Sequence, residues 1–308
     1  MGKPPTIVIV IPALAAANNG NWQTAWRWQR FLAPLAPTRF VQIWPDAQAA
    51  ADGLMIALHA RRSADSIAAW HARHGGASLA VALTGADLYR DIAVDAAARR
   101  SLDLAGRLVV LQELGLRALP EACRAKAQVI CQSATLRTPL PKTPRRQRAL
   151  MVGNLREEKD PATLFAAARP LKKERDPVLG EAARATMAAC PRYRWLGGRS
   201  HEETRRRILR AHVLVHASRM EGGAHVVIEA ATSGTPVLAS RTDGNVGLLG
   251  EDHAGCFPCG DAPALAESLR RRRLCPAAGR TVRPSRPPVR ARQRTRGGAG
   301  PRRGPAHR

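Results

Sequence analysis

Short apolar runs alternate with amphipathic segments along most of the chain. In the first half, apolar runs predict strands near residues 6–11, 39–44, 54–58, 79–83, 107–111 and 127–131. Helical spacing of apolar positions between them predicts helices near residues 20–33, 63–73, 96–103 and 113–119. Strands that alternate with helices are typical of a parallel, doubly wound sheet, so we expect one α/β domain over residues 1–137.

A proline-rich segment separates this half from a second series of the same kind. Pro139, Pro141 and Pro144 cannot continue a sheet or a helix, and we expect a linker over residues 138–148. The second series predicts strands near residues 149–153, 193–196, 213–217 and 237–240, and helices near 161–169, 179–189 and 201–210. This indicates a second α/β domain over residues 149–270, with a ligand-sized cleft between the two.

The most informative stretch follows the apolar run 213–217. It places Glu221 and Glu229 eight positions apart around the glycine pair Gly222–Gly223. We expect a strand, a tight turn made by the glycines, and then a helix whose first amides can face an anion. The glycines would let a ligand approach, and ionised carboxylates accept hydrogen bonds from the paired hydroxyls of a sugar or ribose.

This stretch resembles the glutamate-x7-glutamate signature of GT-B glycosyltransferases, above all the retaining enzymes of GT4 type. The resemblance implies two Rossmann-like, doubly wound domains that face a cleft. It implies that Glu229 holds the ribose of a UDP donor, and that Glu221 or His225 holds the transferred sugar.

The start of the second domain carries cations beside a predicted helix. Gly153 ends a strand, and Asp160–Pro161 is a typical beginning of a helix. Arg156 and Lys159 precede that helix, where they could bind a diphosphate. The segment resembles the phosphate motif of the same enzymes, although Asn154 stands where they have an arginine.

Three strand ends of the first domain carry polar residues. Asn19 and Gly20 belong to the turn after the first strand, and in GT-B enzymes the corresponding loop approaches donor phosphate and acceptor. His59 ends the third strand, and Arg61 and Arg62 beside the next helix start could hold an anionic acceptor. Asp87 follows the fourth strand; it and His59 are the candidates for a general base.

Read together, these segments resemble one branch of the GT4-type enzymes, the selenosugar synthases of selenoneine biosynthesis. The resemblance covers residues 6–270. It implies transfer of N-acetylglucosamine or glucose from a UDP donor to selenophosphate, without a metal and without a further cofactor, to give a 1-selenosugar. A GT4-type enzyme with an ordinary hydroxyl acceptor would share the donor motifs and stays an alternative.

The basic residues of the chain are concentrated at its carboxyl end. The formal net charge of the chain is +25, but residues 270–308 carry fourteen arginines and no acidic residue. The rest of the chain carries 35 basic and 24 acidic residues, so its net charge is +11. We expect residues 271–308 to be a disordered tail. It is either a basic arm with non-specific contacts to polyanions, or the result of a shifted reading frame; no specific nucleic-acid partner is expected.

The remaining features concern compartment and completeness. No apolar run is long enough to span a membrane, and scattered cysteines are typical of a reducing compartment, so we expect a cytoplasmic protein. Cys256 and Cys259 form a single C-x-x-C pair, which lacks the second pair of a zinc site. Residues 170–180 are too few for the strand that the resemblance implies there. The second domain therefore looks incomplete, and an inactive truncated copy is a further alternative.

Overall fold

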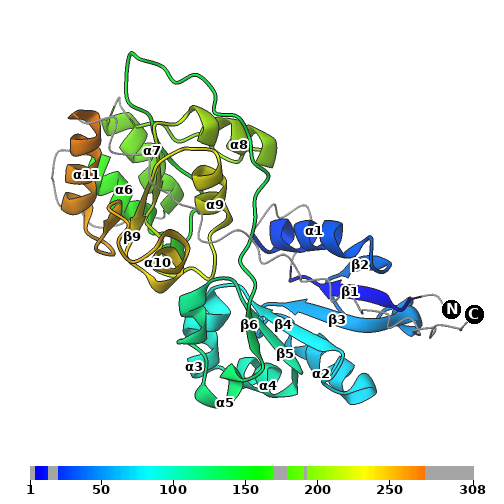
Figure 1. The fold of residues 1–308 in the computed structure, drawn as a ribbon. Coiled ribbons are helices and arrows are strands. Elements are labelled where there is room, and N and C mark those ends of the chain that lie inside the picture. The colour runs from blue at the N-terminus through cyan, green and yellow to red at the C-terminus, as the bar shows by residue number, and fades with distance from the viewer. Residues whose placement is uncertain (1–3, 13–19, 169–178, 191–192, 275–308) are drawn as a thin grey trace, which may run out of the picture.

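In the computed structural model, residues 4–12, 20–168, 179–190 and 193–274 can be described. They form two parallel sheets with helices around each (Figure 1), which is the α/β architecture expected from the alternating pattern. None of the helices in these ranges is long and apolar enough to cross a membrane. The prediction for the tail covers residues 275–308, which lie outside them. The shortened segment near 170–180 also lies outside them, apart from its last two residues.

The first sheet has six parallel strands in the order β2-β1-β3-β4-β5-β6. The strands are β1 (Thr6–Val10), β2 (Thr38–Val41), β3 (Asp52–Leu58), β4 (Leu79–Leu83), β5 (Arg107–Val110) and β6 (Ala127–Val129). Each lies within a few residues of its predicted position. The strand order changes direction between β1 and β3, and such a switch point opens a crevice at the carboxyl ends of the strands.

Helices cover both faces of this sheet, as Figure 1 shows. Helix α1 (Gly20–Leu32) packs on one face, where Trp22 and Trp28 contact a buried apolar layer. The other face carries α2 (Ala64–His74) and α4 (Ala96–Leu104), with Trp70 fully buried. Trp26, on the same helix, is 42% exposed, with the Arg30 guanidinium 5.1 Å from its ring centre.

The predicted helix over residues 113–119 is replaced by shorter elements. These are a 3-10 helix, η4 (Glu113–Leu116), and helix α5 (Glu121–Arg124). Pro120 separates them, because proline lacks the amide proton that a continuous helix would need there. A π-helical turn, η3 (Asp87–Asp91), and the short helix α3 (Ile92–Val94) follow β4.

The second sheet has four parallel strands in the order β10-β9-β8-β7. These are β7 (Ala149–Met151), β8 (Val213–His216), β9 (Val237–Ser240) and β10 (Cys256–Phe257). The helices around it are α6 (Pro161–Ala168), α7 (Leu179–Ala189), α8 (His201–Arg210), α9 (His225–Thr232), α10 (Asp243–Leu249) and α11 (Ala262–Leu274). Two short elements, β10 and α10, had no signal in the apolar pattern.

Two predictions for this half are wrong. Residues 193–196 form no strand, because Tyr193 packs edge-on against Phe165 and Trp195 lies under Arg184 instead of pairing with the sheet. Helix α11 continues to Leu274, so ordered structure runs past the expected boundary at residue 270.

Candidate functional site

A deep cleft of about 1930 Å³ is lined by residues from both halves. From the first half it receives the start of α1, the end of β3 and the turn after β4. From the second it receives the loop before α6 and the segment from β8 into α9. Most of the predicted site residues line it: Gly20, His59, Arg62, Arg156, Lys159, Glu221, Gly223, His225 and Glu229. Asn19 lies outside the described residues.

Three predicted residues do not line the cleft. Arg61 donates from Nε to Asp91 over 2.9 Å, so its guanidinium is engaged away from the cleft wall. Asp87 is fully buried, and its carboxylate accepts from the backbone amides of Ala60, Thr84 and Gly85. A carboxylate with both oxygens bound to amides holds two loops together, so the structure places Asp87 as a positioning residue.

Gly222 is the third, and its small size serves a contact between the two halves. A Cβ at Gly222 would lie 2.5 Å from the carbonyl carbon of Thr84, and one at Gly223 would lie 2.7 Å from the Leu111 side chain. The sequence predicts that this glycine pair lets a ligand approach. The structure shows instead that Gly222 admits the backbone of the first half, while Gly223 both packs on Leu111 and reaches the cleft.

Further contacts from the second half complete this junction. Helix α10 packs on η4, and a Cβ at Gly247 would lie 1.8 Å from Oε1 of the buried Gln112. Gln112 in turn donates to the Tyr89 hydroxyl over 2.7 Å. Sequence reasoning missed this junction, since α10 carries no amphipathic signal and the partners lie far apart in the chain.

Glu221 lines the cleft and has two basic partners. Its Oε1 atom pairs with Lys159 Nζ and lies 3.2 Å from Nε2 of the buried His216. Burial alone would raise the pKa of Glu221, but Lys159 and His216 outweigh it and lower that pKa well below its usual range. Glu221 is therefore a carboxylate, and Lys159 is already engaged with it.

Glu229 lies on α9 and gathers basic side chains from α8 and α9. Its Oε1 atom lies 2.9 Å from His201 Nε2, 3.4 Å from His225 Nε2 and 3.3 Å from Arg205 Nε. Burial raises the pKa of this carboxyl, and its hydrogen bonds with the two histidines outweigh that effect and lower it to about 2. Its other oxygen, Oε2, is buried and has no hydrogen-bond partner among the described residues.

His201 and Arg205 are site residues that sequence reasoning missed. They lie four positions apart, on one face of α8, and that helix begins at the Ser200 cap. The spacing was visible in the sequence, but nothing local indicates that this face meets Glu229, 24 residues beyond Arg205.

His59 adopts a strained backbone with φ of +76°, in the left-handed region that residues other than glycine seldom occupy. Its Nδ1 lies 3.9 Å from Asp87 and its Nε2 lies 3.9 Å from Asp91. Burial lowers the pKa of His59, although Asp87 opposes this. The ring is therefore neutral at pH 7.

Comparison with known proteins agrees with this architecture. Residues 190–275 match the family described as glycosyl transferases group 1. Among solved structures, the chain resembles sucrose-phosphate synthase from Thermosynechococcus elongatus, with 17% identity, a TM-score of 0.68, and coverage of 90% of this chain and 92% of the other. It also resembles Anabaena HepE in complex with UDP and glucose, with 14% identity, a TM-score of 0.63, and coverage of 87% and 90%. None of the curated proteins matches the chain.

At these identities the structural likeness shows the fold. The protein has the GT-B architecture of glycosyltransferases, with two parallel-sheet halves around a shared cleft, as the sequence had predicted. The segment that matches the group 1 family contains α8, Glu221, His225 and Glu229, which form one wall of that cleft.

Proposed function

We propose that the protein is a cytoplasmic glycosyltransferase that moves N-acetylglucosamine or glucose from a UDP donor to selenophosphate. The observation that supports a UDP-sugar donor is the state of the Glu229 carboxylate. Its Oε2 atom is buried, ionised and without a partner among the described residues, on a residue that lines the cleft. Such an oxygen is available to accept from a ligand in the cleft, and a ribose hydroxyl is suited to it.

The charges in the second half suit a nucleotide leaving group. Arg156 lines the cleft, and no ion pair of its side chain occurs among the described residues. Sugar transfer builds negative charge on the departing phosphate, and a guanidinium would stabilise it without a metal ion. Lys159 contributes less directly because it pairs with Glu221, and Glu221 is left to orient the sugar.

The acceptor side rests on Arg62 and His59. Of the two predicted acceptor arginines, Arg62 lines the cleft, as does the neutral His59 ring. An anionic acceptor would pair with this guanidinium.

Selenophosphate as that acceptor rests on the sequence resemblance. Its selenium would bond to C1 of the sugar as the bond from C1 to the UDP oxygen breaks and its electrons pass to UDP. Hydrolysis of the phosphorus–selenium bond by water then gives the 1-selenosugar. An already anionic selenium needs no strong base, which agrees with a site where Asp87 is occupied.

A direct assay separates these possibilities. The full chain is incubated with UDP-N-acetylglucosamine or UDP-glucose and selenophosphate, without added metal, and UDP release is measured together with the mass of any selenosugar. We expect product with the natural chain and with the control Glu267→Gln on the exposed face of α11, and at least a tenfold loss in Glu229→Gln. UDP release with alcohols but not with selenophosphate would favour the hydroxyl-acceptor alternative.

The second alternative is an inactive copy whose basic tail contacts polyanions. Removal of residues 275–308 would then abolish salt-sensitive binding to DNA. UDP release that survives the truncation would contradict this alternative.

A further inference from the structure

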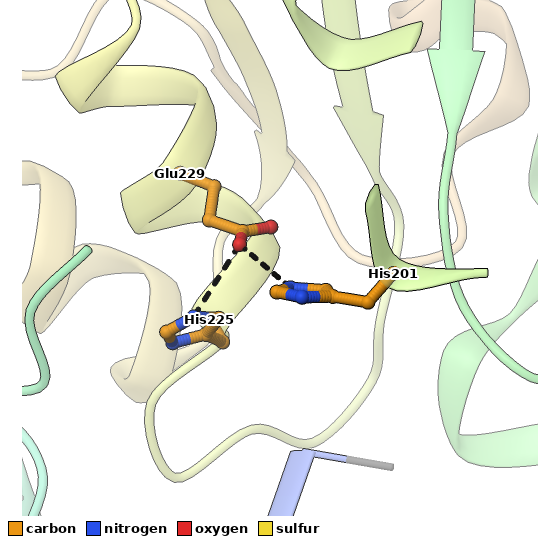
Figure 2. Close-up of side chains that lie close together, drawn as sticks. All are labelled: His201, His225 and Glu229. Atoms are coloured by element: carbon orange, nitrogen blue, oxygen red, sulfur yellow. Dashed lines mark hydrogen bonds and ion pairs between the residues drawn. The ribbon is translucent and has the colours of Figure 1, made fainter. Parts of the chain in front are cut away.

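His201, His225 and Glu229 point their polar atoms toward one another from α8 and α9, as Figure 2 shows. Both imidazoles present Nε2 to the same carboxylate oxygen, at 2.9 and 3.4 Å. Two imidazoles and a carboxylate are also the donor set of many protein zinc sites.

Hydrogen bonds from the first half decide which nitrogen of His225 carries its proton. The Nδ1 atom of His225 lies 3.2 Å from Oε1 of Gln132. The amide nitrogen of Gln132 donates to Thr24 Oγ1 over 2.8 Å, and Thr24 donates to the Gly20 carbonyl over 2.9 Å. This chain of donors leaves the Gln132 oxygen as an acceptor, so the proton of a neutral His225 belongs on Nδ1.

A protonated His225 donates from Nε2 to Glu229, whereas a neutral His225 with its proton on Nδ1 directs a bare Nε2 lone pair at the same carboxylate. Two acceptors at 3.4 Å repel each other unless a proton or a cation stands between them. A hydrogen bond that holds Nδ1–H while Nε2 faces a ligand position is also how metal-binding histidines are oriented.

We propose that His201, His225 and Glu229 bind one divalent transition-metal ion, of which Zn²⁺ and Co²⁺ are suitable examples. The three ligand atoms all lie within 4.8 Å of one another. A tetrahedral ion with bonds of about 2 Å requires ligand separations of about 3.3 Å, close to the two observed distances. Water from the cleft supplies the fourth position, since all three residues line it.

Arg205 opposes the ion and limits its affinity. Its Nε atom lies 3.3 Å from the same Glu229 oxygen, and its guanidinium also donates to the Thr135 carbonyl over 3.0 Å. A guanidinium keeps its charge at any pH where a protein folds, so it repels a bound cation. Removal of this charge should strengthen metal binding, which distinguishes a metal site from a merely structural polar cluster.

The ion would compete with the donor nucleotide. This second part rests on the proposed function, because it requires that Glu229 accepts from the ribose. Zn²⁺ on Glu229 would then act as an inhibitor of an enzyme that needs no metal for transfer.

The test is a Co²⁺ titration of the tag-free full chain without nucleotide. Binding is monitored by the visible absorption of tetrahedral Co²⁺. The exposed thiols of Cys131 and Cys259 are alkylated first so that they cannot bind the ion. We expect one equivalent of Co²⁺, displaced by Zn²⁺, with binding at least tenfold weaker in His201→Ala and His225→Ala. His212→Ala, a histidine of the same half outside the cluster, should bind as the natural chain does.

Arg205→Gln provides the second variant, and we expect it to bind Co²⁺ severalfold more tightly. The metal site would be overturned if the natural chain showed no absorption of bound Co²⁺. It would also be overturned if both histidine variants and Arg205→Gln bound Co²⁺ with the same affinity as the natural chain. UDP binding is measured separately by calorimetry. If UDP binds and leaves the Co²⁺ affinity unchanged, the competition is refuted while the metal site stands; if UDP does not bind, it is the proposed function that fails.

Discussion

Lys159 forms an ion pair with the buried carboxylate of Glu221, 62 positions further along the chain. The pair joins the loop before α6 to the turn before α9, so it connects the two segments on which the donor motifs lie. The geometry of one motif therefore depends on the other.

The first prediction concerns this pair. Lys159→Met leaves Glu221 buried with His216 as its remaining basic neighbour, and we expect unfolding to require about 2 kcal/mol less, since Lys159 is itself partly exposed. Urea unfolding measures the difference. Lys159→Arg should retain most of the stability, and Lys159→Met with Glu221→Gln should recover part of it. Equal stability of Lys159→Met and the natural chain would contradict this role.

The second prediction is a dependence of stability on pH. The pKa of Glu229 is lowered to about 2 in the folded protein, against an ordinary value of 4.5. A carboxyl with a lowered folded pKa stabilises the protein above its ordinary pKa and loses that contribution as pH falls toward the folded value. The contribution of Glu229, about 3 kcal/mol at pH 7, should therefore disappear between about pH 5 and pH 2.

The comparison that isolates this group is Glu229→Gln, whose amide does not titrate. Its free energy of unfolding should fall less steeply than that of the natural chain over the same pH range. Glu267→Gln, on an exposed surface, should leave the slope nearly unchanged because that carboxylate is not buried. Parallel curves for Glu229→Gln and the natural chain would refute the assignment.

The third prediction concerns the junction of the two halves. Gly222→Ala would place a methyl group 2.5 Å from the Thr84 backbone. A backbone atom cannot move aside as easily as the end of a flexible side chain. We expect a loss of about 1–3 kcal/mol, measured by thermal unfolding. Gly198→Ala is the control, since a Cβ there meets nothing within 4 Å and its φ is ordinary. If both variants unfold at the same temperature, the junction is not tightly packed at this point.

The fourth prediction uses His59 to discriminate between acceptors. Asparagine tolerates the left-handed backbone that His59 adopts, so His59→Asn removes the base with little distortion. With an alcohol acceptor, loss of a general base should reduce kcat by about 10²–10⁴. With selenophosphate the reduction should stay below about tenfold, because the nucleophile is already anionic. A large loss with selenophosphate would show that His59 has another role in that reaction.

The sequence by itself determined the class of fold and most of the strands. Apolar runs such as Thr6–Val10 and Val213–His216 have buried strands as their simplest solution, and alternation with helices leads to parallel sheets. Glu221 and Glu229 could likewise be placed at a strand–turn–helix junction, because that junction is built from neighbouring residues.

Tertiary structure decided which partners these carboxylates have. Lys159 meets Glu221, and His201 and Arg205 meet Glu229, across distances in sequence that no local periodicity encodes. The role of Gly222 changed for the same reason, since only packing of the two halves brings Thr84 beside it. Local patterns follow from backbone geometry and burial, whereas the charge environment of a buried group depends on everything that folds around it.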